Sequence, residues 1–165
     1  MYFNQPFSYQ EQIVPPPFVH MPIQNFYMMQ DYKSAELIEE AAKRERILAI
    51  YDNKIMESFE DELDRKRIYK ISLNQIRHQK MLEEIYRGMT RKKLSINIKE
   101  PDCDDNLKSN LDRRIFEGFE CIELYRKIYF FIVPMEWKQM MYEIISDEQN
   151  DILKYIYYFN KVDRH

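Results

Sequence analysis

The chain has 165 residues and a formal net charge of −3 at pH 7, which argues against a protein that binds nucleic acid through a general positive charge. Two glycines, one threonine and four valines argue against an all-β domain, which needs turn glycines and β-branched residues. The composition therefore predicts a mainly α protein of one domain with appendages.

Residues 1–33 are rich in proline and aromatic residues and almost uncharged before Asp31. Prolines at this spacing prevent a helix, so we expect an extended tail. Such a tail could enter an aromatic-lined groove of a partner, or it could pack across its own helices. The candidate partner-binding residues of the tail are Pro16, Pro17, Phe18, Phe26 and Tyr27.

Residues 34–93 are predicted to form a long amphipathic helix or a helical hairpin. Between Ser34 and Arg87 there are 54 residues without glycine or proline, and good helix formers dominate. Ser34 is a plausible N-cap, and Gly88 is a plausible stop because glycine readily takes the left-handed conformation that ends helices. One unbroken helix over residues 34–87 would be roughly 80 Å long.

The apolar stripe of this segment changes face near residues 64–68. Its first half carries a stripe that includes Tyr51, Ile55 and Phe59, which are candidate partner-binding residues, whereas the stripe that begins at Ile68 lies nearly opposite. Two explanations remain open. The helix breaks near residues 64–68 and folds back, or its two halves dock on different partners.

Charge also changes along the segment. Residues 57–64 are acidic, whereas residues 65–93 contain ten Lys or Arg against two Glu. A solvated helix face with intrahelical ion pairs explains such runs, and a face that contacts phosphates or an acidic protein is the alternative. The candidate nucleic-acid-binding residues are Lys66, Lys70, Arg77, Lys80, Arg87 and Arg91.

Residues 94–106 are predicted to be an acidic linker, and residues 107–165 a helical bundle with apolar residues at helical spacing. Gly118 weakens its first helix by about 1 kcal/mol relative to alanine. The capping-box pattern of residues 146–149 predicts the start of a final helix.

No catalytic, cofactor or metal site is predicted. Asp102, Asp104 and Asn106 match the start of a calcium loop, but Leu107 and Arg113 stand where glycine and glutamate are required. The three histidines are scattered without ligand spacing, and His78 is expected on the helix surface. No nucleotide-binding or hydrolase motif occurs, so we expect that the chain is not an enzyme.

The expected setting is intracellular, in the cytoplasm or nucleus. Cys103 and Cys121 form no patterned pair, and neither a signal-peptide core nor an apolar run approaching a membrane span occurs.

Two hypotheses of function follow from these features. The first is a non-catalytic helical adaptor that binds protein partners in a larger complex through its tail and long helix. The alternative is a factor bound to RNA or to a ribosome through the basic residues between 66 and 91. A homodimer through a coiled coil is possible but not favoured, because the apolar stripe covers only about four heptads.

Overall fold

The computed structural model describes residues 23–162, and their side chains from Lys33 onward. Four α-helices make up this part of the chain: α1 (Ile23–Glu57), α2 (Glu62–Thr90), α3 (Leu107–Phe131) and α4 (Met135–Val162). Residues 23–162 contain no strand. The prediction of a mainly α protein is confirmed.

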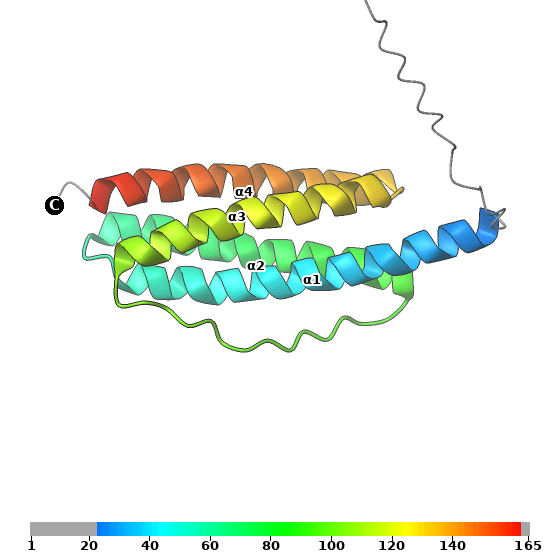
Figure 1. Ribbon diagram of the computed structural model, residues 1–165, viewed down its shortest axis with the longest axis horizontal. Helices are drawn as coiled ribbons and strands as arrows, with labels where there is room; N and C mark the ends of the chain where they lie inside the picture. Colours follow the sequence, from blue (N-terminus) through cyan, green and yellow to red (C-terminus); the bar gives the residue numbers. More distant parts are fainter. Residues whose placement is uncertain (1–22, 163–165) are drawn as a thin grey trace, which may run out of the picture.

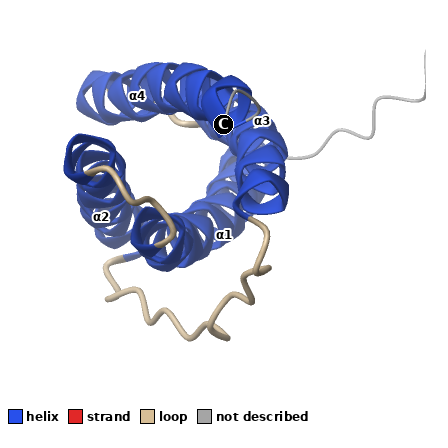
Figure 2. Cartoon of the chain, turned by 90° about the vertical axis from the view of Figure 1, so that its left-hand side faces the viewer, coloured by secondary structure: helices blue, strands red, loops and turns tan. Residues whose placement is uncertain are grey.

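The helices form one antiparallel bundle made of two hairpins (Figure 1). The connections within the α1–α2 and α3–α4 hairpins are short. Because α2 and α3 run in the same direction, residues 91–106 must return along the length of the bundle, and they do so over the outer side of α1 (Figures 1 and 2). One long crossover is the topology of ferritin-like bundles.

The segment predicted as one long helix or a hairpin is a hairpin, and its break lies earlier than residues 64–68. Asp61 is the N-cap of α2, and its carboxylate accepts a hydrogen bond from the Asp64 backbone N–H at 2.8 Å. The sequence did not locate the helix break correctly because an acidic N-cap, rather than a glycine or a proline, marks the start of the second helix. The change of apolar face now has a simple cause, since the two halves run in opposite directions.

The beginning of α1 lies within residues 1–33, which were expected to be extended. The helix starts at Ile23, directly after the last proline of the tail, Pro22. Beyond that proline nothing in the sequence forbids a helix. The candidate residues Pro16, Pro17 and Phe18 lie outside the described residues, as do the side chains of Phe26 and Tyr27.

Both glycines lie inside helices where another helix approaches closely. A Cβ at Gly88 would meet Trp137 Cζ2 at 2.5 Å, and a Cβ at Gly118 would meet Ile152 Cγ1 at 2.6 Å. The stop of α2 is instead Arg91, whose φ of 61° is left-handed and whose N–H bonds to the Arg87 carbonyl. The two glycines are therefore packing residues rather than a cap and a weakness.

The core consists of two apolar clusters along the bundle. One contains Leu48, Leu82, Tyr125 and Ile144 near the α3–α4 turn, and the other contains residues such as Ile55 near the α1–α2 turn. Buried charged and polar side chains from all four helices occupy the level between the two clusters: Glu45, Asp52, Ser72, Gln75, His78, Arg114, Glu148 and Asp151.

Candidate functional site

Arg114 of α3 is the centre of this buried polar level. Its side chain is fully buried, its Nε lies 2.8 Å from Asp52 Oδ1 of α1, and its Nη1 lies 2.8 Å from Glu148 Oε1 of α4. The guanidinium also lies over the Tyr155 ring, 4.9 Å from its centroid. One cation thus bridges carboxylates from two other helices.

Two neutral side chains donate further hydrogen bonds to these carboxylates. The Gln75 amide of α2 donates to Glu148 Oε2 at 3.1 Å, and the Tyr155 hydroxyl donates to Asp52 Oδ1 at 2.7 Å. Each of the four helices therefore contributes a side chain to one connected network. The second oxygen of Asp52 and the amide oxygen of Gln75 accept no hydrogen bond within the described residues.

Burial and the neighbouring groups of opposite charge have opposing effects on the pKa of Asp52 and on that of Arg114. Burial raises the pKa of Asp52 to about 6, while Arg114 and Tyr155 oppose the rise. Burial also disfavours the Arg114 cation, but Asp52 and Glu148 outweigh it and raise the pKa of Arg114 well above its usual value. Arg114 therefore stays positively charged at every physiological pH.

A second buried group lies one helical turn away, around His78. Its Nε2 lies 3.2 Å from Asp147 Oδ2, and its Nδ1 lies 3.5 Å from Glu45 Oε1. The Tyr125 hydroxyl donates to Glu45 at 2.6 Å. Burial opposes protonation of His78, but the carboxylates of Glu45 and Asp147 outweigh it and raise the pKa of His78.

Sequence reasoning missed both groups. His78 was expected on the surface, yet it is fully buried, and the Ser146–Gln149 pattern lies inside α4 with Glu148 directed into the core. A signal was present: Asp52 lies between Leu48 and Ile55 at spacings of four and three residues, on the apolar face of its helix. A charged residue at such a position is buried and requires a partner.

The predicted partner-binding residues of the long helix are core residues. Tyr51, Ile55 and Phe59 have exposed fractions of 2%, 0% and 8%, and they pack against α3 and α4.

The predicted phosphate-binding residues lie along the exposed side of α2 and at its C-cap. Arg77 pairs with Glu143 and Asp147 of α4, Lys66 pairs with Glu62, and Arg91 caps the helix. Lys80 and Arg87 line a shallow cavity together with Glu83 and Glu84.

Comparison with solved structures identifies the architecture. The X-ray structure of the bacterioferritin of Desulfovibrio desulfuricans, determined for its diiron site, superimposes with a TM-score of 0.69 at 14% identity, covering 84% of each chain. The chain has the bacterioferritin fold. A hypothetical protein from Pyrococcus furiosus superimposes with a TM-score of 0.68 at 17% identity, over 80% of this chain and 91% of that one. No protein-family model and no curated protein matches the sequence.

These findings contradict both predicted functions, the non-catalytic helical adaptor and the RNA- or ribosome-bound factor. The adaptor hypothesis assumed that the long helix has more apolar surface than a small C-terminal bundle can cover. In the bacterioferritin fold, α1 and α2 are half of the bundle, and their apolar faces are covered by α3 and α4. The hypothesis was wrong because it treated residues 107–165 as a separate core.

Within residues 23–162, no helix is long and apolar enough to cross a membrane.

Proposed function

We propose that this chain is a metal-independent protein with a ferritin-like fold, in which a buried arginine carries the positive charge that metal ions supply in dimetal members of that fold. The bridge from Arg114 to Asp52 and Glu148 is the observation that supports the proposal. In this proposal the chain neither stores nor oxidises iron, and the expectation that it is not an enzyme is kept.

The spacing of the inward residues resembles that of a ferritin-like dimetal site. Such sites use one glutamate from each of two helices and a Glu-x-x-His motif from each of the other two. Here α2 carries Gln75 and His78 three residues apart, and α4 carries Glu148 and Asp151 at the same spacing. The positions are therefore of the ferritin type, although the side chains are not.

The side chains present do not fit two metal ions. An amide stands in place of the α2 glutamate, a carboxylate in place of the α4 histidine, and the buried charged residue of α3 is an arginine, Arg114. A guanidinium has no lone pair to offer a metal. The described residues include no group of three or more His, Cys, Asp or Glu arranged to hold a metal ion.

Electrostatic repulsion also disfavours a metal ion at this site. A divalent cation that bound Asp52 and Glu148 would have to share them with the Arg114 guanidinium. At a separation of about 4 Å and an effective dielectric constant of about 20, the repulsion is on the order of 8 kcal/mol. That is comparable to the whole free energy of a micromolar binding site, about 8 kcal/mol.

Cobalt titration of the purified full-length chain, followed by visible absorption, tests the proposal. We expect no saturable binding by the wild-type chain, whereas R114E/Q75E binds cobalt at the bundle centre. The matched control is R113E/Q79E, which makes the same charge changes on the same two helices away from the cluster, and it should behave as wild type.

Saturable binding by the wild-type chain that D52N removes would overturn the proposal. So would a folded R114E/Q75E variant that binds no more cobalt than the wild-type chain, because Arg114 would then not be what excludes the metal. Circular dichroism reports whether each variant is folded.

A further inference from the structure

A pocket on the side of the bundle, between α2 and α4, is separate from the buried polar network around Arg114. Its volume is about 510 Å³, and it is lined by Arg67, Lys70, Leu153, Lys154, Tyr157 and Tyr158. Of the helix pairs that touch, α2 and α4 pack together least, which leaves room for this pocket between their side chains. Its size is within the range of pockets that bind small organic molecules.

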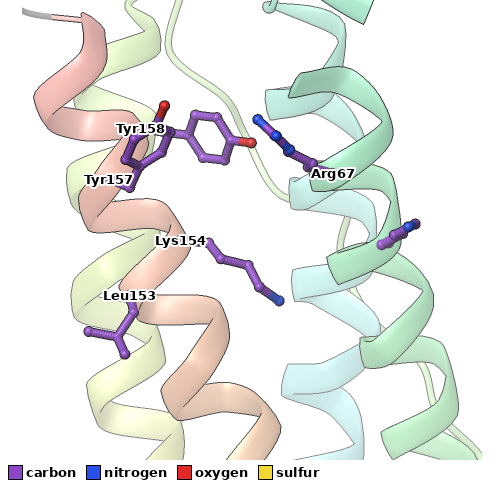
Figure 3. Close-up of a pocket in the computed structure, with 6 residues that line it drawn as sticks. Arg67, Leu153, Lys154, Tyr157 and Tyr158 are labelled. Atoms are coloured by element: carbon purple, nitrogen blue, oxygen red, sulfur yellow. The ribbon is translucent and has the colours of Figure 1, made fainter. Parts of the chain in front are cut away.

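One wall of the pocket is apolar and aromatic. Leu153 and Tyr157 have exposed fractions of 64% and 56%, whereas Tyr158 is almost fully buried. The Tyr158 ring is fixed by edge contacts with Phe59 and Tyr157, whose centroids lie 5.1 and 5.3 Å away. In Figure 3 this ring points from α4 toward Arg67 of α2. The wall is therefore rigid at its base and open to solvent at its edge.

The other lining residues are cations with too few carboxylates to neutralise them. Arg67 pairs with Asp64 at 3.2 Å, and Lys154 pairs with Asp151 at 2.5 Å. Asp64 is shared with a further cation, Lys161.

Lys70 has neither an ion pair nor a hydrogen bond to any residue in the described part of the chain. The three cations that line the pocket thus have two carboxylate partners, one of which, Asp64, is shared with Lys161. In Figure 3 the Lys154 chain extends from α4 toward α2, across the pocket, so the excess charge borders the apolar wall.

We propose that this pocket binds an amphipathic organic anion, a molecule with a carboxylate or sulfonate head and an apolar body. The head would pair with Lys70 and Lys154, and the body would cover Leu153 and Tyr157. Charge-assisted hydrogen bonds fix the head, and burial of apolar surface contributes the rest of the affinity. The inference goes beyond the metal-independent function and does not depend on it, because no lining residue belongs to the Arg114 cluster.

The probes are 8-anilinonaphthalene-1-sulfonate, followed by its fluorescence, and decanoate as a competitor, both with the full-length chain. We expect saturable fluorescence that decanoate displaces and that weakens with salt. K70Q and Y157A should each weaken dye binding about fivefold, the effect of one partly exposed charge pair or one partly covered ring.

Two matched variants serve as controls. K66Q removes a lysine of the same helix that pairs with Glu62 outside the pocket. F119A alters a neighbouring groove, between α3 and α4, that shares Leu153 with the pocket but has no other lining residue in common with it. Neither should change dye binding by more than about a factor of two.

The proposal would be overturned by the absence of saturable binding of either probe, by equal weakening in K66Q and K70Q, or by weaker dye binding in F119A but not in Y157A. Displacement by decanol as effective as that by decanoate would show that the cations play no part, and would overturn it as well. Cobalt binding by the wild-type chain would refute the metal-independent function and leave this result unchanged.

Discussion

Replacement of Arg114 by methionine is the most direct test of the buried network. Methionine keeps an unbranched apolar stem of similar length but removes the cation. Asp52 and Glu148, both fully buried, would then face each other without a counter-charge. Breaking a buried ion pair by removal of one partner costs about 3–5 kcal/mol.

Urea denaturation, followed by circular dichroism, measures this loss. A domain of this kind has about 5–15 kcal/mol of stability, so a loss of about 3–5 kcal/mol in R114M is a fifth of it or more. The neighbouring R113M is the control. Arg113 is about half exposed and contacts Glu117 at 3.5 Å, so its replacement should cost about 1 kcal/mol or less.

The triple variant D52N/R114M/E148Q separates charge from packing. It removes the carboxylate charges together with the cation, so we expect it to be more stable than R114M alone. A loss in R114M no larger than that in R113M would refute the reasoning, since Arg114 would then not hold the carboxylates. A triple variant less stable than R114M would show that shape, rather than charge, determines the cost.

Two further predictions concern pH and close packing. Because the folded pKa of His78 is raised above its unfolded value, its contribution to stability is complete below about pH 6.5 and is lost as pH rises through the folded pKa. The deficit of H78Q in urea denaturation should therefore shrink from pH 6 toward pH 9, and a constant deficit would contradict this. G118A should lower the free energy of unfolding by about 1–3 kcal/mol, because the new Cβ would meet Ile152 and Glu148 within 3 Å. A gain of the size expected from helix propensity, about 1 kcal/mol, would show that α3 and α4 separate without cost.

The helical class of this protein could be predicted because it depends on local properties. Few glycines, few valines and threonines, and apolar residues at helical spacing all favour helices. The hairpin was one of two open alternatives, and its turn lies within the acidic run of residues 57–64, where Asp61 is the N-cap of α2. What could not be predicted locally is that residues 107–165 and residues 23–90 share one core, since this depends on contacts far apart in sequence.

The two glycines illustrate the same limit. In sequence, Gly88 is typical of a helix C-terminus, and Gly118 of a weak point in a helix. In the fold each lies where the side chain of another helix, Trp137 or Ile152, occupies the space of a Cβ. Helix propensity alone predicts that glycine destabilises the helix at these two positions. Close packing between the helices explains why no larger side chain stands there.

The buried network around Arg114 could not be predicted from the sequence for a related reason. Arg113 and Arg114 are adjacent and identical in type, yet one is about half exposed and the other is fully buried. A rotation of about 100° between successive residues separates them, and only the position of α3 against α1 and α4 determines which one turns inward. A buried guanidinium requires carboxylates from other helices, and these carboxylates require the guanidinium in turn. The charge balance is therefore a property of the assembled bundle, and it is the reason why a chain with the spacing of a dimetal site is proposed here to need no metal.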